Sequence, residues 1–447
     1  MKASPRSMAV LILNRVEEER SYAGPLLDAG RSATGMDDIK DRRLLTQIVY
    51  GVLRHRGRLD WVLAAFYRGD FSSMEVGLKN ILRVGLYQIL LLDRIPSYAA
   101  VNEAVKAARK MFPGRDRLVN GILRGALRGM GNIAYPDPLE EPAGYLSVFH
   151  SHPQWLVSRW IDELGVEETR RLCESNNEEP PLTLRVNRLK ADRGEILSLL
   201  RREQCGAVPA SVAPQGVILE RTDGAITDMG LFRDGYIQPQ DEASQLIAHL
   251  VEPKPGEMVL DLCSGNGVKT THLAELMNNR GTIVAVDVNG DKIGHLKRLA
   301  ARLGVDIIRT LVQDATQDLG ASFHKAFDRI LVDVPCSGLG TLRRNPEIKW
   351  RISPEDLKEL VPLQKKLLNQ AAAYLKKGGS IVYSTCTIDR EENEDMVRDF
   401  LDDHPGFRHS HPPVALSNVA PPGTFFRSFP HHHGMDGFFG AVLQRGE

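Results

Sequence analysis

The last third of the chain alternates between short apolar runs and segments with helical periodicity. Strands are expected at 258–261, 282–287, 329–334 and 380–384, and helices at 270–277, 292–303 and 354–375. Because polar residues do not interrupt the apolar runs, the pattern predicts a mostly parallel sheet with helices on both faces. Ligands of such sheets bind outside the carboxyl ends of the strands, so the residues after each run are the first candidates for a site.

The turn after the first expected strand carries two glycines, Gly265 and Gly267. Without side chains, they let backbone amides approach a bound nucleotide where the next helix begins. Asp287 ends the second expected strand, 20 residues after Gly267, which is the separation typical of an acidic side chain that binds ribose hydroxyls. The pattern indicates an adenosine-containing cofactor and leaves both NAD and S-adenosylmethionine open.

Two cysteines follow later strands of the same region, Cys336 in Asp333-Val-Pro-Cys and Cys386 in Tyr383-Ser-Thr-Cys. Carbon 5 of cytosine is too weak a nucleophile to attack a methyl sulfonium, but a thiolate that adds to carbon 6 turns the ring into an enamine-like carbanion. Asp333 is suited to hydrogen-bond the ring nitrogen beside the exocyclic amine. An inert buried thiol explains either cysteine alone, whereas two at separate strand ends favour methylation of cytosine from S-adenosylmethionine.

The thiolate is the reactive form of cysteine, so we expect a helix terminus or a cationic neighbour beside the attacking thiol. The five cysteines are scattered and contain no Cys-x-x-Cys pair, which argues against a disulfide framework or a structural zinc site. Consecutive histidines at 431–433 do not converge easily on one ion, so we expect a polar loop there and no bound metal. No apolar stretch reaches the length of a membrane span and no signal peptide is apparent, so a cytoplasmic location is expected.

The first 130 residues show apolar positions at three- and four-residue spacing, in segments separated at Gly69-Asp70, Pro96-Ser97 and Pro113-Gly114. This pattern predicts a helical bundle. The whole chain has a formal net charge of zero, but this part holds 22 Lys and Arg against 13 Asp and Glu. The surplus favours an acidic partner, and solvated helix faces are the alternative explanation.

The middle of the chain has a proline-rich linker and a small mixed module. The linker is expected at 131–150, and the module from 153 to 240 carries helices at 155–164 and 193–202 and strands at 182–186 and 217–219. We therefore expect three domains: an all-α domain at 1–135, a small α+β subdomain at 150–240 and a catalytic α/β domain at 241–447.

Several motifs in the first domain are those of a known fold. They are Asp41-Arg-Arg-Leu-Leu, Gly51-Val-Leu-Arg54, Leu59-Asp60, Leu82-Arg-Val-Gly-Leu-Tyr-Gln-Ile-Leu and Val119-Asn-Gly-Ile-Leu-Arg124. With them the first 130 residues or so resemble the NusB-type RNA-binding fold. The resemblance implies contact with RNA through basic helix surfaces.

The rest of the chain carries a second, more specific set of motifs. They are Gln240-Asp-Glu-Ala-Ser-Gln245, Asp261-Leu-Cys-Ser-Gly-Asn-Gly-Val-Lys-Thr270, Asp333-Val-Pro-Cys-Ser-Gly-Leu-Gly-Thr-Leu-Arg-Arg-Asn-Pro-Glu-Ile-Lys-Trp350, Tyr383-Ser-Thr-Cys386, Glu391-Glu-Asn393 and His433-Gly-Met-Asp-Gly-Phe-Phe439. Residues 150–447 thus resemble the Sun-type RNA (cytosine-5) methyltransferases. Together with the NusB-like N-terminal part, the whole chain resembles the bacterial B-type branch of this family, whose members methylate 16S ribosomal RNA. The fold implied is a Rossmann-like S-adenosylmethionine-dependent methyltransferase domain.

The resemblance also implies roles for single residues. Cys386 is the nucleophile and Cys336 helps to release the methylated product, the reverse of the DNA enzymes. Asp287 and Asp314 hold the ribose and adenine of the methyl donor, and Asp333 is a further residue of the cofactor site. The turn that wraps the methionine end consists of Cys263, Ser264, Gly265, Asn266, Gly267, Val268 and Lys269.

This turn departs from the usual Cys-Ala-Ala-Pro-Gly-Gly-Lys-Thr of the family. Asn266 replaces the proline, and Val268 replaces a glycine. A side chain at Val268 is expected to crowd the donor or to alter the turn, which affects donor affinity more than the type of reaction.

A basic segment follows the Pro-Cys motif, with Arg343, Arg344, Lys349, Trp350 and Arg351. Its mixture of charge and an aromatic ring suits phosphates and a stacked base. An exposed basic loop with a packing tryptophan explains the composition equally well.

The expected substrate is RNA and not DNA, with the target cytosine in a single-stranded or loop region of small-subunit ribosomal RNA, because both faces of the ring must be exposed. We expect a monomer with no membrane partner. Two alternatives stay open: a ribosome assembly factor that binds RNA on a methyltransferase fold of weak or lost activity, and a nicotinamide-dependent oxidoreductase. The second leaves both strand-end thiols without a role.

Overall fold

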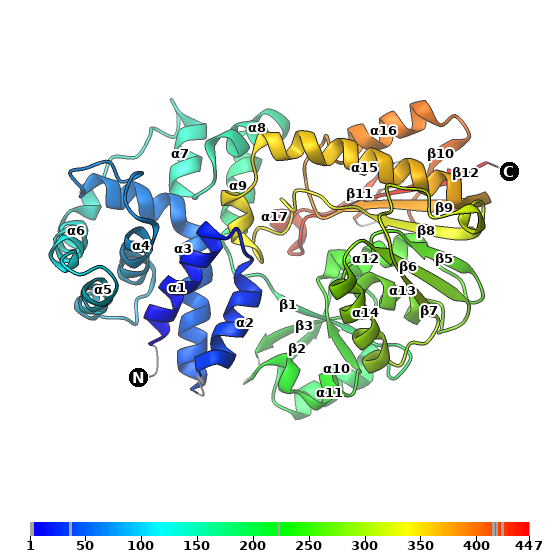
Figure 1. The fold of residues 1–447 in the computed structure, drawn as a ribbon, viewed down its shortest axis with the longest axis horizontal. Helices are drawn as coiled ribbons and strands as arrows, with labels where there is room; N and C mark the ends of the chain where they lie inside the picture. Colours follow the sequence, from blue (N-terminus) through cyan, green and yellow to red (C-terminus); the bar gives the residue numbers. More distant parts are fainter. Residues whose placement is uncertain are drawn as a thin grey trace. The chain divides into compact units, whose positions relative to one another are not determined.

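Helices make up the first part of the chain, and two sheets with flanking helices make up the rest (Figure 1). The computed structural model describes residues 4–34, 38–221, 224–413, 416, 419–421 and 424–446. The chain divides into two units. Unit 1 comprises Met1–Glu179 and Leu342–Arg351, and unit 2 comprises Pro180–Thr341 and Ile352–Glu447. The division into three domains expected from the sequence stays a prediction.

Unit 1 is helical, as the apolar spacing predicts. Its helices are α1 (Pro5–Glu18), α2 (Ala23–Thr34), α3 (Ile39–Ala65), α4 (Val76–Leu91), α5 (Ser97–Met111), α6 (Asp116–Gly129), α7 (Pro142–Phe149), α8 (Gln154–Leu164) and α9 (Val166–Asn176), with short 3₁₀ turns η1 (Met130–Asn132) and η4 (Pro346–Trp350). The expected linker at 131–150 is wrong in part, because α7 occupies its second half. Pro142 is the first residue of α7, where its missing N–H costs no hydrogen bond.

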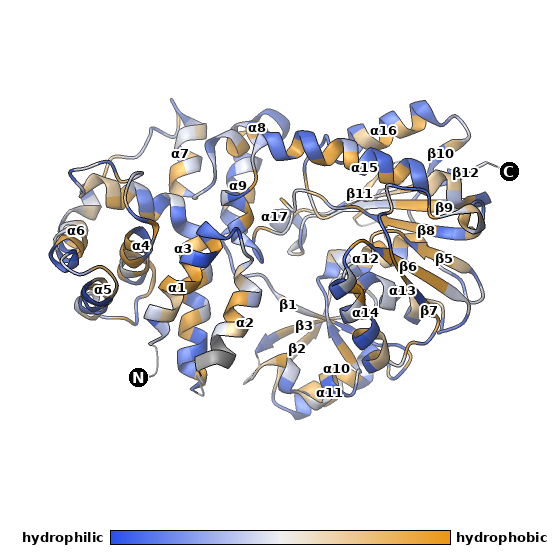
Figure 2. Cartoon of the chain, viewed as in Figure 1, coloured by the Kyte–Doolittle hydropathy of each residue, from blue (hydrophilic) through white to orange (hydrophobic). Residues whose placement is uncertain are grey.

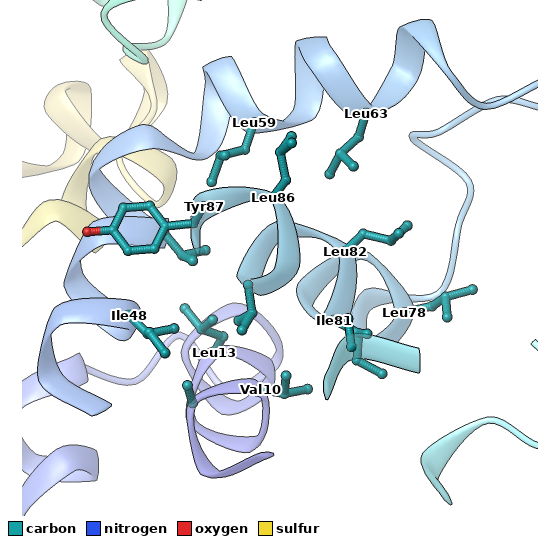
Figure 3. Close-up of a cluster of buried hydrophobic side chains, with 14 of the residues drawn as sticks. Val10, Leu13, Ile48, Leu59, Leu63, Leu78, Ile81, Leu82, Leu86 and Tyr87 are labelled. Carbon is teal, nitrogen blue, oxygen red and sulfur yellow. The ribbon is translucent and has the colours of Figure 1, made fainter. Parts of the chain in front are cut away.

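The core of unit 1 lies around α4. Figure 3 shows Leu82 and Leu86 of this helix among apolar side chains of α1 and α3, including Leu13 and Leu59. Apolar residues on several sides of a helix indicate that it is surrounded by others. The long helix α3 has a kink at His55, whose backbone leaves the helical region. The bundle thus forms for the reason that the periodicity indicates, namely burial of one stripe from each helix.

Unit 2 contains an eight-stranded sheet in the order β10-β12-β9-β8-β5-β6-β7, with β11 paired to β12. Its strands are β5 (Met258–Asp261), β6 (Thr282–Asp287), β7 (Ile308–Val312), β8 (Phe327–Asp333), β9 (Leu375–Thr385), β10 (Phe407–Ser410), β11 (Phe426–Arg427) and β12 (Phe439–Arg445). Neighbours among β5 to β9 are parallel, and β10, β11 and β12 add an antiparallel edge. The prediction of a mostly parallel Rossmann-like sheet is confirmed for its centre.

Helices cover both faces of this sheet. Successive residues of each strand point to opposite sides, so neighbouring residues belong to different clusters. Val259 packs in a cluster with α12 (Glu242–Val251), α13 (Val268–Leu276) and α14 (Gly290–Leu303). Its neighbour Leu260 packs in a second cluster with α15 (Pro354–Tyr374) and α16 (Glu394–Asp403). In Figure 2 the strands β5, β8 and β9 are largely orange, as expected for strands buried on both faces.

A smaller antiparallel sheet precedes the large one in unit 2. Its order is β2-β3-β1-β4, with β1 (Leu182–Val186), β2 (Gly206–Pro209), β3 (Gly216–Arg221) and β4 (Ile237–Pro239). It is accompanied by α10 (Arg193–Arg202), the short α11 (Gly230–Arg233) and a 3₁₀ turn η2 (Ile226–Asp228). The helix α10 begins with a capping box between Asp192 and Glu195, which explains its agreement with the predicted range.

Further features differ from the sequence prediction or add to it. Strands β7, β10 and β11 were not predicted, and residues 430–433 form the one-turn helix α17 and not a loop. A 3₁₀ turn, η3 (Ala321–Phe323), precedes β8. Within the described part of the chain, the helices all fall short of the combined length and apolar character that crossing a bilayer requires. The expected absence of a metal stays a prediction.

Candidate active site

The two strand-end cysteines lie next to each other in unit 2. Strands β8 and β9 are parallel neighbours, with Asp333 opposite Ser384, so their carboxyl ends meet at one edge of the sheet. The loop after β8 brings the Cys336 Sγ to 3.3 Å from the Cys386 Sγ. The hydrogen bond between the two sulfurs, together with burial, raises the pKa of Cys336 well above its ordinary value. Cys336 is therefore a neutral thiol beside Cys386 at neutral pH.

A half-buried cation, Lys269, lies beside this pair. The Lys269 Nζ donates a hydrogen bond of 2.7 Å to the Asp333 Oδ2, while the Ser384 Oγ donates one of 2.8 Å to the Asp333 Oδ1. Burial lowers the pKa of Lys269, but the carboxylate of Asp333 and the nearby Cys386 sulfur outweigh it, so the net shift is upward. Lys269 is thus protonated and supplies the cationic neighbour that an attacking thiolate needs.

The ammonium of Lys269 also lies 5.0 Å from the ring centre of Phe438, within cation–π distance. The sequence assigned Lys269 to the cofactor turn only. The structure adds a contact with Asp333 that spacing along the chain does not reveal, because it depends on β5 lying beside β8.

The glycine turn after β5 approaches the end of β6. The Gly265 N–H donates to the Asp287 Oδ2 at 2.9 Å, and the Asn289 N–H donates to the Asp287 Oδ1 at 2.8 Å. Gly267 has a φ of +83°, and a Cβ at this position would lie 2.4 Å from the Leu296 Cγ. The turn therefore requires glycine at 267 for both its backbone angle and its packing.

Asp314 follows β7, the strand next to β6 in the sheet. It is exposed and accepts hydrogen bonds from the Thr316 N–H at 2.9 Å and the Thr316 Oγ at 2.8 Å. These bonds lower the pKa of Asp314. Asp287 and Asp314 thus stand at the ends of two neighbouring parallel strands, as a shared nucleotide site requires.

The residues of the turn fit S-adenosylmethionine. Ser264 is buried, and its hydroxyl has no hydrogen-bond partner among the described residues; the same holds for the Asp261 Oδ1. Buried polar atoms are normally paired, so these two are open to a ligand with polar groups. Burial raises the pKa of Asp261 to about 7 and that of Cys263 well above its ordinary value. A Cβ on Gly265 would meet no atom within 4 Å, which leaves space beside the backbone.

The two substituted positions of the turn differ in their surroundings. Asn266 is exposed, whereas Val268 is half-buried at the start of α13. The Val268 carbonyl accepts a hydrogen bond of 2.8 Å from Arg185, a fully buried residue of β1 that also forms a 2.8 Å ion pair with Glu275. The small sheet therefore holds the backbone of the turn. The expected effect of Val268 on donor affinity stays a prediction.

The sequence did not assign a role to Glu392 beyond its place in a family motif. This buried residue accepts hydrogen bonds from Ser337, the neighbour of Cys336, and from Gln364 of α15. The next residue, Asn393, accepts a 2.6 Å bond from the Thr385 Oγ and donates to the Thr387 carbonyl at 3.0 Å. Glu392 and Asn393 thus brace the loops on which both cysteines stand.

A second motif supports the same loops from the other side. A Cβ on Gly340 would lie 1.8 Å from the Gly437 carbonyl oxygen, and the Gly437 N–H donates to the Gly340 carbonyl at 2.8 Å. The Gly340 N–H in turn donates to the Cys386 carbonyl at 3.0 Å. The two glycines let these backbones meet.

The basic segment after the Pro-Cys motif is not an exposed loop. Residues 342–351 belong to unit 1, where Lys349 is fully buried and donates to the Arg54 carbonyl at 2.9 Å and the Asn177 Oδ1 at 2.8 Å. The Trp350 indole N–H donates to the Leu53 carbonyl at 2.8 Å. Both interpretations of the composition placed Lys349 in contact with solvent or RNA, and both are wrong for this residue. Burial lowers the pKa of Lys349 to about 7.

Family models match three parts of the chain. The 16S rRNA methyltransferase RsmB/F model matches residues 248–444, the NusB family model matches 3–128, and the RsmF/B-like ferredoxin-like domain model matches 152–225. These matches agree with the Rossmann-like and NusB-like folds expected from the sequence.

Similar proteins extend the comparison to the whole chain. A solved structure named PH0851 covers 100% of this chain and of its own, with a TM-score of 0.84 and 29% identity. The structure of a methyltransferase homolog protein from Pyrococcus horikoshii covers 67% of this chain and 97% of its own, with a TM-score of 0.58 and 28% identity. The probable ribosomal RNA small subunit methyltransferase B of Bacillus subtilis is 37% identical over 98% of both chains. On these grounds the chain belongs to the RsmB/F family of 16S rRNA methyltransferases and carries a NusB-family domain at its N-terminus.

Proposed function

We propose that this protein methylates carbon 5 of a cytosine in 16S ribosomal RNA through a covalent bond between Cys386 and carbon 6. Its family makes it a methyltransferase of ribosomal RNA that uses S-adenosylmethionine. The base, the ring position and the covalent step are our proposal. The observation that carries it is the 3.3 Å separation of Cys336 and Cys386 beside the Lys269–Asp333 ion pair. A methyltransferase whose target atom is already a strong nucleophile has no need of two adjacent thiols.

The first step is attack of the Cys386 sulfur on carbon 6 of a cytosine that has left its stack. The ammonium of Lys269 stabilises the negative charge of the attacking sulfur. As the C6–S bond forms, electron density moves onto the ring nitrogen beside the exocyclic amine. That nitrogen takes up a proton, and Asp333 accepts the hydrogen bond from it. Lys269, 2.7 Å from Asp333, is the proton source.

Carbon 5 is now nucleophilic. S-adenosylmethionine supplies an electrophilic methyl group when bound at the turn of Cys263, Ser264, Gly265, Asn266, Gly267, Val268 and Lys269 with Asp287 and Asp314. The Ser264 hydroxyl, buried without a partner among the described residues, is suited to the polar methionine end. The aspartates at the ends of β6 and β7 are suited to the nucleoside end.

Release requires loss of the carbon 5 proton and cleavage of the C6–S bond. Hydrogen bonding with Cys386 is the largest cause that raises the pKa of Cys336. Bonding of the Cys386 sulfur to carbon removes this cause, so Cys336 loses its proton more readily in the adduct than in the free protein. Cys336 gives its own proton to solvent and then takes up the carbon 5 proton. The Cys386 thiolate leaves as the C5=C6 bond forms again, and the ring nitrogen returns its proton to Lys269.

The partner that this chemistry requires is RNA with the target cytosine unpaired, in a single-stranded or loop region. The NusB-family domain with its surplus of basic residues supports RNA binding. We further propose that the protein acts as a monomer in the cytoplasm.

Transfer of a labelled methyl group from the donor to 16S rRNA tests the proposal. Cys386→Ala is expected to abolish transfer, and Cys336→Ala is expected to leave a covalent protein–RNA adduct that shifts on a denaturing gel. Cys205→Ala is the matched control, because this cysteine directly precedes β2 of the small sheet and does not follow β8 or β9. An adduct with Cys386→Ala would show that the two roles are reversed, and full activity of both variants would contradict the covalent mechanism.

A further inference from the structure

Side-chain hydrogen bonds connect the residues that directly follow the two site cysteines. The hydroxyls of Ser337 and Thr387 are 2.8 Å apart, and both residues are buried. Ser337 follows Cys336, and Thr387 follows Cys386. The distance between the two sulfurs is therefore tied to a contact one residue further along each loop.

The Ser337 side of this contact is held by the carboxyl group of Glu392. The Glu392 Oε1 accepts a 2.5 Å bond from the Ser337 Oγ, and the Glu392 Oε2 accepts a 2.9 Å bond from the Ser337 N–H. Because the Ser337 hydroxyl donates to Glu392, it accepts from the Thr387 hydroxyl. Burial raises the pKa of Glu392, and two bonds to the same residue fix the position of Ser337 relative to this carboxyl group.

Glu392 is itself anchored on several sides. The Gln364 side chain of α15 donates to the Glu392 Oε2 at 2.8 Å, and the Tyr383 hydroxyl of β9 donates to the Glu392 carbonyl at 2.7 Å. Helix α15 packs on β8, β9 and α16, which Figure 1 shows side by side. Glu392 thus connects the Cys336 loop to helix α15 and strand β9.

We propose that Glu392 is a positioning residue that holds Cys336 in place for product release, while attack by Cys386 depends on it much less. The reason is geometric. Two of the bonds of Glu392 go directly to Ser337, whereas Cys386 continues strand β9, and its carbonyl accepts from the Gly340 N–H independently. The inference rests on the covalent mechanism proposed above. It assigns Glu392 to product release and not to the attack on carbon 6.

Loss of the Glu392 carboxylate is therefore expected to resemble loss of the Cys336 thiol. The C6–S and C5–methyl bonds still form, but removal of the carbon 5 proton slows, and the adduct persists. A merely structural role for Glu392 predicts something else, namely less folded protein with an unchanged ratio of adduct to product.

The experiment measures a single turnover with 16S rRNA and labelled donor in the full-length variants Glu392→Gln, Glu392→Ala and Ser337→Ala. We expect methyl incorporation into total RNA to stay within about threefold of wild type, while free methylated RNA falls at least tenfold and adduct rises to match. Glu392→Gln keeps one acceptor oxygen and should fall between wild type and Glu392→Ala. Glu391→Gln is the matched control, because this neighbouring carboxylate is exposed, and wild-type behaviour is expected of it.

Cys336→Ala in the same assay separates the inference from the proposed function. If Cys336→Ala forms no adduct, the covalent mechanism fails. If it forms the adduct but Glu392→Gln and Ser337→Ala release product at the wild-type rate, the role of Glu392 is wrong. Loss of both adduct and methyl incorporation in these two variants, with unchanged thermal unfolding, also overturns it. Should Glu392→Ala not fold, the other two variants decide.

Discussion

Lys269 and Asp333 form an ion pair of 2.7 Å although 64 positions separate them in the sequence. Lys269 stands in the first turn of the helix after β5, and Asp333 ends β8, the parallel neighbour of β5. The pair links the turn proposed to bind the methyl donor to the end of the strand that precedes Cys336. Removal of either charge leaves the other partly buried without its counterion.

Lys269→Met is expected to lower kcat for methyl transfer by about 100-fold or more, the usual size of an acid–base contribution. Lys297→Met, on an exposed position of α14, is the control and should behave as wild type. The measurement is labelled methyl transfer at saturating donor. An unchanged kcat for Lys269→Met would show that the lysine takes no part in the reaction.

The same pair makes stability depend on pH at the alkaline end. The pKa of Lys269 is raised above its ordinary 10.5 by Asp333, so the stabilisation is fully present below about pH 10.5 and is lost as pH rises through the raised value. Between pH 7 and 9, wild type and Lys269→Met are therefore expected to differ by a constant amount in chemical denaturation.

Lys349 predicts a pH dependence of the opposite sign. Burial lowers its pKa from 10.5 to about 7, so the unfolded chain binds more protons at this residue between these pH values. The contribution of Lys349 to the free energy of unfolding then rises with pH by up to about 1.4 kcal/mol per unit in that window. Lys349→Met should remove this slope, which denaturant unfolding at pH 7, 8 and 9 measures. Parallel curves for wild type and variant would show that Lys349 is protonated in the folded state.

The buried pair of Arg185 and Glu275 is expected to matter for both stability and donor binding. Arg185→Met leaves a buried carboxylate without its partner, which costs about 3–5 kcal/mol of unfolding free energy. It also removes the hydrogen bond to the Val268 carbonyl, so calorimetry should show weaker binding of S-adenosylmethionine. The double variant Arg185→Met, Glu275→Leu should recover stability without recovering donor affinity. Recovery of both stability and donor affinity would mean that Arg185 affects donor binding only through the packing of the core, and not through its hydrogen bond to the Val268 carbonyl.

Gly267 and Gly265 provide a matched comparison in the donor turn. Both have positive φ, but an added Cβ would strike Leu296 only at Gly267, and nothing within 4 Å at Gly265. The left-handed backbone costs a non-glycine residue roughly 1–2 kcal/mol. Gly265→Ala is expected to weaken donor binding by about tenfold or less, and Gly267→Ala by more than that. Equal effects of the two variants in a binding titration would contradict the packing argument.

The agreement between sequence and structure is best where local pattern decides. The apolar runs that become β5 and β6 begin and end where the sequence predicts, since a strand buried on both faces must be continuously apolar. Strand β7 was missed because Arg309 and Thr310 interrupt its apolar run at the edge of the sheet. Helix α7 was missed because Pro136, Pro138 and Pro142 suggest a linker, although a proline at the first helical position is favourable.

The sequence of this protein determined its two fold types and the chemistry available to it, because periodicity, glycine turns and thiols at strand ends are local properties of the chain. The tertiary structure alone decided which of these groups meet. It paired Lys269 with Asp333 and connected Ser337 to Glu392 by hydrogen bonds. It also buried Lys349, a residue that the composition of its segment had placed on the surface. The physical reason is that strand order and burial depend on contacts between distant segments, and spacing along one segment carries no record of them.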